Sequence, residues 1–246
     1  MKSWQDNITF VLVEPSEPGN IGSSARAIAN MGFKNLALIK PVALSEESYA
    51  FAHGAEDILK NALIYDDLKE AVKETNQVFG TSRRVGKKRG LFFSPWDSSK
   101  LIYHIAQKNK VALLFGSESR GLLNKETALC NRMIYIPAEK TQPSINLAHS
   151  VMIIAYELRR YDLLKDNSEA NEKTSFFPKS ISREKIDDLL KRIESKVSLL
   201  DYPKNDKERK IMQNITNLLS RAGVTYWEEQ MIQGLCSQLQ KRLTNR

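Results

Sequence analysis

Short apolar runs alternate with amphipathic patterns through the first 165 residues of the chain. The runs read as β-strands because they are short, rich in Val, Ile, Leu and Phe, and bounded by polar or turn residues. The predicted strands cover residues 8–14, 35–40, 77–82, 111–116 and 132–137, with a weaker strand at 62–65. The predicted helices cover residues 22–31, 46–60, 67–74, 97–108 and 124–130, with Asp97 as a candidate N-cap. Because the run at 111–115 is continuously apolar, we expect an α/β fold with a mostly parallel sheet between helices.

Helical periodicity dominates the rest of the chain. Residues 144–165 form a long amphipathic pattern that Ser144 is suited to cap. Three further patterns cover residues 182–200, 206–221 and 225–239. Gly223 is expected to end the second, and Thr225-x-x-Glu228 has the form of a capping box for the third. The polar segment between the two parts reads as a linker, so we expect domains at 1–165 and 181–246 joined by residues 166–180.

The positive charge is informative because it is locally concentrated. The net charge of +8 divides into +4 for residues 165–246 and +4 for the preceding part, so there is no basic tail. The stretch "RRVGKKR", residues 83–89, holds five cations in seven positions and no acid. Such a cluster suits a polyanion such as RNA. A solvated loop that aids solubility explains the composition equally well.

Several classes of protein are disfavoured by the pattern. No apolar run is long enough to cross a bilayer and the N-terminus has no leader pattern, so we expect a cytoplasmic protein without a membrane segment. Cys130 and Cys236 have neither metal-ligand nor redox spacing, and we expect them to be buried as small apolar residues. We expect no metal, because no His/Cys/Asp cluster has ligand spacing.

The first candidate motif is "EPSEPGNIGSSARAIANMG", residues 14–32, which follows a predicted strand. It lacks the Gly-x-Gly-x-x-Gly of a dinucleotide site, since only Gly19 and Gly22 are present, with Asn20 between them. These glycines would allow the backbone to approach another group closely. Arg26 offers five fixed donors that suit a phosphate or a ribose oxygen, and a surface ion pair is the alternative.

A second candidate motif is "FGSESRGL", residues 115–122. Glu118 follows a buried strand, at the edge where parallel sheets bind ligands. A helix-capping role or an ion pair with Arg26 is the alternative for this carboxylate.

Two further motifs place small polar side chains beside the same edge. "SINLAHSVMIIAYEL" opens a helix with Ser144 and Asn146, and capping explains Ser144 better than Asn146. "GTSRR", residues 80–84, follows a strand and leads directly into the basic cluster. This order predicts a small-ligand pocket next to a polyanion track.

Taken in order, these motifs resemble the signatures of the SpoU/TrmH family of RNA ribose 2′-O-methyltransferases, within the SPOUT class. "GTSRR", "FAHGAEDIL" at 51–59 and the helical C-terminal extension are similar to its TrmJ-like branch. The resemblance implies an α/β knot with a C-terminal trefoil, S-adenosylmethionine as methyl donor and a homodimer. It implies 2′-O-methylation of a cytidine or uridine ribose at position 32 of the tRNA anticodon loop. A ribosomal RNA 2′-O-ribose methyltransferase and a catalytically silent RNA-binding protein of the same fold remain the alternatives.

The resemblance also assigns roles to residues of this chain. The implied cofactor-binding residues are Thr81, Ser82, Arg83, Gly116, Ile136, Pro143, Ser144 and Ile145. The implied catalytic residues are Arg26, Asn20, Glu118, Ser144 and Asn146. The expected RNA-binding residues are Arg84, Lys87, Lys88 and Arg89. Because an arginine keeps its proton in proteins, we expect Arg26 to grip a phosphate and stabilise the 2′-oxygen rather than act as a base.

Overall fold

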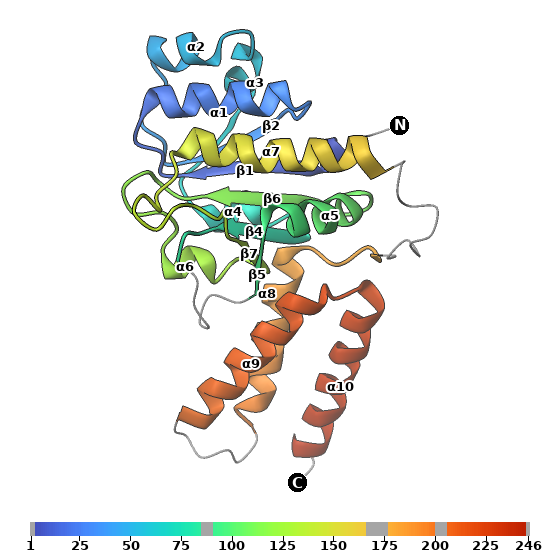
Figure 1. Cartoon of the computed structure of the whole chain (residues 1–246). Coiled ribbons are helices and arrows are strands. Elements are labelled where there is room, and N and C mark those ends of the chain that lie inside the picture. The colour runs from blue at the N-terminus through green and yellow to red at the C-terminus, as the bar shows by residue number, and fades with distance from the viewer. Residues whose placement is uncertain (1–2, 85–90, 166–176, 200–205, 245–246) are drawn as a thin grey trace. The chain divides into compact units, whose positions relative to one another are not determined.

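The computed structural model describes residues 3–84, 91–165, 177–199 and 206–244. The chain divides into two compact units, Met1–Phe177 and Pro178–Arg246 (Figure 1). The expected RNA-binding residues Lys87, Lys88 and Arg89 lie outside the described residues, as does most of the expected linker. The domain boundaries at 165 and 181 therefore stay predictions.

A seven-stranded sheet forms the centre of the first unit, with every strand pair parallel. Its order is β3-β2-β1-β6-β4-β7-β5. The strands are β1 (Ile8–Val13), β2 (Asn35–Ile39), β3 (Leu63–Tyr65), β4 (Gln77–Thr81), β5 (Phe92–Phe93), β6 (Val111–Phe115) and β7 (Arg132–Ile134). The mostly parallel α/β sheet expected from the apolar runs is confirmed, and the knot stays a prediction. Because β6 lies between β1 and β4, the loops that follow these three strands emerge together.

Helices cover both faces of this sheet. They are α1 (Pro18–Asn30), α2 (Glu46–Ala52), α3 (Glu56–Lys60), α4 (Leu68–Val72), α5 (Pro95–Ala106), α6 (Asn124–Thr127) and α7 (Leu147–Leu164), after a short 3-10 turn at Trp4–Asn7. Alternate residues of β1 separate the two cores. Phe10 and Leu12 pack in the larger cluster with residues of α1, α5 and α7, whereas Val11 and Val13 pack in the smaller one with residues of α4. Figure 1 shows α1 and α7 lying side by side, with α2 beyond α1.

Local backbone geometry corrects three of the sequence expectations. The helix expected at 46–60 is two helices, because the chain turns through positive φ at His53 (23°) and Gly54 (81°). Asp97 is not an N-cap: α5 begins at Pro95, and the Ser94 hydroxyl accepts from the Asp97 amide at 3.1 Å. The two-residue strand β5 was not expected, since Phe92–Phe93 is too short to show a periodicity.

The second unit contains α8 (Arg183–Val197), α9 (Asp206–Ala222) and α10 (Tyr226–Thr244). Its core is built from Ile181, Ile186, Leu189, Leu219 and Val224. Gly223 follows α9 with φ of 71°. The predicted capping box is present at the start of α10, because the Thr225 amide donates to Glu228 at 2.7 Å and the Glu228 amide donates back to the Thr225 hydroxyl at 3.4 Å.

The two cysteines differ in burial, and only Cys236 is buried as expected. Cys130 is half-buried, with its thiol donating to the Glu126 carbonyl at 3.6 Å, and Cys236 is buried. No helix in the described ranges is long and apolar enough to cross a membrane.

Candidate functional site

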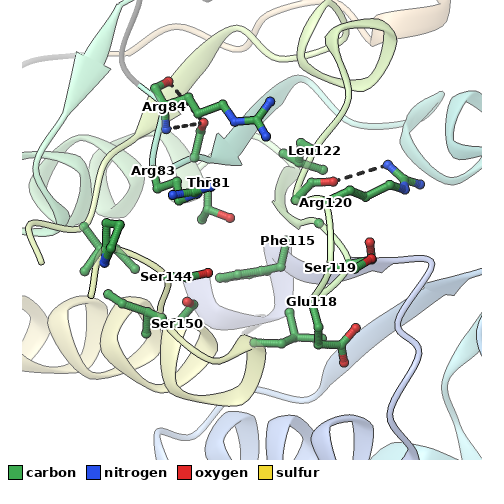
Figure 2. Close-up of a pocket in the computed structure, with 18 residues that line it drawn as sticks. Thr81, Arg83, Arg84, Phe115, Glu118, Ser119, Arg120, Leu122, Ser144 and Ser150 are labelled. Carbon is green, nitrogen blue, oxygen red and sulfur yellow. Dashed lines mark hydrogen bonds between the residues drawn. The ribbon is translucent and has the colours of Figure 1, made fainter. Parts of the chain in front are cut away.

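A pocket opens where the loops after β4, β6 and β7 meet the start of α7 (Figure 2). All eight residues expected to bind the cofactor line it. The other lining residues are Arg84, Phe115, Ser117, Glu118, Ser119, Arg120, Gly121, Leu122, Leu147 and Ser150. Figure 2 shows Thr81, Phe115 and Ser144 facing one shared space. The structure therefore brings together residues that are up to 69 positions apart, from 81 to 150, although their roles stay predictions.

The end of β4 supplies one wall of the pocket. The Thr81 hydroxyl donates to the Leu114 carbonyl of β6 at 3.0 Å, and the Ser82 amide donates to the Ile134 carbonyl of β7 at 3.0 Å. Arg84 bends back, so that its amide donates to the Ser82 hydroxyl at 3.1 Å. Two adjacent guanidinium groups, on Arg83 and Arg84, consequently border the pocket.

The loop after β6 forms the opposite wall and explains Gly116. A Cβ at this position would lie 2.1 Å from the backbone carbon of Gly121, so no other residue fits. The loop folds back because the Gly121 amide donates to the Ser117 carbonyl at 2.8 Å and Gly121 has φ of 65°. The loop geometry by itself therefore requires glycine at position 116.

A continuous chain of hydrogen bonds starts at Glu118, which lines the pocket, and links the three motifs. We call it the Glu118–Asn20–Asn146 chain. The Asn20 amide nitrogen donates to Glu118 Oε1 at 2.9 Å, and the Asn146 amide nitrogen donates to Asn20 Oδ1 at 2.8 Å. At the other end, both the amide and the hydroxyl of Ser16 donate to Glu118 Oε2, at 3.0 and 2.9 Å. Every donor in the chain thus points toward the carboxylate.

The charge of Glu118 is stabilised by these contacts. Burial by itself would raise the pKa of Glu118, but the hydrogen bonds from Ser16 and Asn20 outweigh it and hold that pKa below its usual value. Figure 2 shows the carboxylate directed away from the space that Ser144 faces. The alternative reading of Glu118, an ion pair with Arg26, is not found within this copy, because Glu118 accepts from Ser16 and Asn20 instead.

The start of α7 reverses the expectation for its capping residue. Asn146, not Ser144, is the N-cap, because its Oδ1 accepts from the amides of Ala148 at 2.8 Å and His149 at 3.3 Å. Ser144 lines the pocket instead. The end of the Glu118–Asn20–Asn146 chain therefore holds the first turn of the longest helix of this unit.

Arg26 is the one expected catalytic residue that belongs neither to the pocket lining nor to the Glu118–Asn20–Asn146 chain. It lies exposed on α1, between the buried residues Ala25 and Ala27, and it does not line the pocket. Asn20 and Asn146 do not line the pocket either, whereas Glu118 and Ser144 do. The structure thus separates the expected catalytic residues into pocket residues, a hydrogen-bonded chain beside the pocket, and an exposed cation on α1.

The glycine in the first motif serves helix packing. A Cβ on Gly22 would lie 2.1 Å from the Ser48 carbonyl of α2, so this glycine allows α1 and α2 to approach closely. A Cβ on Gly19 would lie 3.0 Å from Glu47 Oε1 of the same helix. The two glycines therefore allow the backbone of α1 to approach α2, and not a ligand.

Arg120 is a site residue that sequence reasoning missed. Its guanidinium donates to Glu14 Oε2 at 2.6 Å and forms an ion pair of 3.3 Å with the buried Glu126. The contact with Glu14 raises the pKa of Arg120 and lowers that of Glu14. Glu14 has positive φ, 51°, directly after β1. The sequence showed only that one loop carries Glu14 and another carries Arg120. The two loops lie together because the strands before them, β1 and β6, are neighbours.

The described residues contain no group of three or more His, Cys, Asp or Glu side chains that could hold a metal ion. The residues that line the pocket supply backbone groups, hydroxyls, three guanidinium groups, one carboxylate and apolar side chains.

Known proteins share both the sequence pattern and the fold. The model of the SpoU rRNA Methylase family matches residues 7–156. An uncharacterized tRNA/rRNA methyltransferase of Haemophilus influenzae is 34% identical over 97% of this chain and 96% of its own length. The tRNA (cytidine/uridine/adenosine-2′-O-)-methyltransferase TrmJ of Pseudomonas aeruginosa is 31% identical over 96% of this chain and 95% of its own length.

Solved structures agree on the fold. The crystal structure of TrmJ from Z. mobilis superposes with a TM-score of 0.75 at 24% identity, over 94% of this chain and 98% of that chain. The SpoU methyltransferase AviRb of Streptomyces viridochromogenes, solved in complex with the cofactor AdoMet, superposes with a TM-score of 0.52 at 22% identity. That match covers 64% of this chain and 62% of AviRb.

Proposed function

Because this chain belongs to the SpoU rRNA methylase family, we propose that it transfers a methyl group from S-adenosylmethionine to a ribose 2′-hydroxyl of tRNA. The target in this proposal is a cytidine or uridine at position 32 of the anticodon loop, and the substrate places the activity in the cytoplasm. The observation that carries the proposal is the gathering of all eight expected cofactor residues around one pocket. Relatives named TrmJ that match nearly the whole chain support the choice of tRNA.

The pocket suits the chemistry of S-adenosylmethionine. Phe115, Leu122 and Ile136 offer apolar walls for a flat adenine, and hydroxyls such as that of Ser144 can bond ribose oxygens. The guanidinium of Arg83 suits the carboxylate of the amino-acid end. When bound, the cofactor supplies an electrophilic methyl group on a sulfonium, so the protein has to orient the two reactants.

Proton removal from the 2′-hydroxyl is assigned to phosphate or water. Arg26 stays protonated, so its role in this proposal is to hold the neighbouring phosphate and to stabilise negative charge that develops on the 2′-oxygen. The planar guanidinium binds a phosphate through two parallel hydrogen bonds, which an ammonium cannot match.

The enzyme acts as a homodimer in this proposal. Arg26 is exposed and outside its own pocket, so the partner subunit's Arg26 is the one that serves each site. Mixing Arg26→Ala copies with Ser144→Trp copies, in which the indole blocks the pocket, should restore part of the activity that each variant lacks alone. Failure of the mixture to exceed the two separate variants, with subunit exchange verified, would argue for a site contained in one copy.

The Glu118–Asn20–Asn146 chain is assigned a positioning role. It fixes the loop after β1, the loop after β6 and the first turn of α7 relative to one another. These are the segments that carry the pocket walls and lead to Arg26. Loss of these hydrogen bonds would therefore reduce turnover by displacing the loops, and not by removing a group that touches the reacting atoms.

RNA binding is assigned to Arg84 and the basic stretch that begins there. Arg84 borders the pocket, which suits a phosphate next to the target ribose. Binding of tRNA should weaken as salt is added, and Arg84→Ala should reduce the slope of log K against log salt by about one. Arg83→Ala is the matched control, because its proposed contact is with the cofactor and it should leave the salt dependence nearly unchanged.

The decisive experiment is nucleoside mass spectrometry on tRNA from cells with and without this protein. Loss of a 2′-O-methylated cytidine or uridine at position 32 is the expected result. Loss of a 2′-O-methylated residue from ribosomal RNA alone would instead favour the ribosomal alternative. Unchanged RNA together with no detectable S-adenosylmethionine binding in a titration would favour a catalytically silent protein.

A further inference from the structure

One side of α10 presents an apolar ridge to solvent. Trp227, Met231, Leu235 and Leu239 follow one another at intervals of four, with exposed fractions of 80, 60, 59 and 43%. The opposite side of α10, including the buried Cys236, is packed within the helical unit. Exposed apolar surface that is contiguous in this way marks an interaction site more often than a solvated face.

The charges on α10 have the arrangement of an interface. Residues 230–240 contain no charged side chain. Exposed charges stand only at the two ends, with Glu228 in the first turn and Lys241 and Arg242 in the last. An apolar, charge-free centre between charged ends is typical of protein–protein contacts and is poorly suited to RNA, whose phosphates need cations along the track.

The ridge is complementary to a second copy of itself. Two antiparallel α10 helices related by a two-fold axis near residue 233 would place Trp227 opposite the partner's Leu239 and Met231 opposite the partner's Leu235. Ridges of residues four apart interdigitate in the commonest class of helix packing. The matched spacing of the four side chains therefore meets the requirement that a two-fold contact uses the same patch on both copies.

Charge selects the antiparallel direction. In the antiparallel pair, Glu228 lies opposite the partner's Gln238, about 4.5 Å along the axis from the position of the partner's Lys241. In a parallel pair, each end would meet its own like charge. Opposite charges at facing ends favour the antiparallel copy, and like charges directly opposite one another disfavour the parallel one.

We propose that the exposed side of α10 is a contact surface for the α10 helix of a second copy of this chain, paired antiparallel through Trp227, Met231, Leu235 and Leu239. The contact uses residues of the second unit and none of the pocket residues or Arg26, so the proposal does not depend on which RNA is the substrate. Four side chains are far fewer than the roughly 20–30 residues per partner of a standard interface. The contact is therefore weak by itself, and a covalent trap is the appropriate measurement.

The test uses Met231→Cys in the full-length protein, treated with a short bis-maleimide. In the proposed pair the two copies of residue 231 lie on either side of the two-fold axis and close to it, so a covalent dimer is expected. Gln230→Cys is the matched control, because residue 230 is also exposed on the same helix but lies off the ridge, about 100° around the helix from residue 231. The wild-type protein, with Cys130 and Cys236, gives the background.

A second variant separates the possible occupants of the surface. Leu235→Glu places two carboxylates at the centre of the proposed contact, and added to Met231→Cys it should reduce the covalent dimer at least tenfold without lowering Tm. A covalent dimer from Met231→Cys no stronger than that from Gln230→Cys would overturn the proposal. A Tm lowered by Leu235→Glu without loss of the dimer would assign the ridge to packing within one chain. Protection of Met231→Cys from maleimide by tRNA, with no covalent dimer, would assign it to RNA.

Discussion

The direction of the donors in the Glu118–Asn20–Asn146 chain makes a specific prediction for Glu118→Gln. Wild-type Glu118 accepts three hydrogen bonds of 2.9–3.0 Å from Ser16 and Asn20. A glutamine has only one accepting oxygen, so its amide nitrogen would face a donor in either orientation, the nitrogen of Asn20 or the backbone amide of Ser16. Turning Asn20 over moves the same conflict to Asn146, and turning Asn146 over removes the cap of α7. The conflict therefore cannot relax without cost.

The magnitude follows from the bonds that are lost. A hydrogen bond to a charged group contributes about 1.5–3 kcal/mol, and the lower value applies because Glu118 is only partly buried. We expect Glu118→Gln to lower the free energy of unfolding by about 1.5 kcal/mol and Tm by about 3–6 °C for a chain of this size. Asn20→Asp alone should cost a similar amount, because it sets a second carboxylate against Glu118.

The double variant Glu118→Gln/Asn20→Asp should recover most of this loss. The amide nitrogen of the introduced glutamine would donate to one oxygen of the introduced aspartate, and the other oxygen would accept from Asn146. The charge thus moves to the neighbouring position in the chain of hydrogen bonds, and all the donors find acceptors. Both Tm and kcat should return to within a few degrees and a few-fold of wild type, giving a strongly favourable coupling energy in the double-mutant cycle. Glu17→Gln is the control, since it removes an exposed carboxylate from the same loop.

Additive losses in the cycle would refute the reasoning. If the double variant lost as much kcat as the two single variants together while its Tm recovered, the negative charge itself would be required at position 118. Glu118 would then act on the substrate or on the proton and not through Asn20 and Asn146.

Three further predictions use other parts of the structure. Gly22→Ala should destabilise the protein by about 1–3 kcal/mol, because the new methyl would meet α2, whereas Gly234→Ala, in open space on α10, should be neutral or stabilising in thermal unfolding. Folding lowers the pKa of Glu118, so ionised Glu118 stabilises the fold above the unfolded pKa near 4.5, and this stabilisation is lost as the pH falls through the folded pKa. The unfolding free energies of wild type and Glu118→Gln should therefore converge in acid. Arg26→Lys should reduce kcat at least tenfold with Tm unchanged, and near-normal turnover would exclude a need for the planar guanidinium.

The inner strands of the sheet could be predicted because burial on both faces leaves an unbroken apolar run, whereas the two-residue strand β5 could not. Val111–Phe115 is buried along its whole length, and this is why its sequence has no polar interruption. The pocket residues were implied by the family resemblance, and the parallel sheet explains why they gather, since residues after Thr81, Phe115 and Ile134 all emerge at the carboxyl edge of parallel strands. Local patterns were not sufficient everywhere, because the prediction missed the break between α2 and α3 and the residue that caps α5.

The hydrogen-bond and ion-pair partners at the carboxyl edge of the sheet could not be predicted. Ser144 and Asn146 have nearly equal propensity to cap a helix. Asn146 takes the cap while it also bonds to Asn20, 126 residues earlier in the chain, and no local pattern reports such a contact. Arg120 and Glu14 are a second example, because each reads as an ordinary surface charge until β1 and β6 are known to be neighbours.

The bond between Asn20 and Asn146 also constrains the order of events during synthesis. The loop after β1, with Asn20, leaves the ribosome early. Its partner Asn146 is made only when more than half of the chain has been synthesised. A nascent chain that ends before α7 lacks one wall of the pocket and the cap that anchors it, whatever the state of its sheet. Ligand capture should therefore begin abruptly, with the emergence of a single late helix.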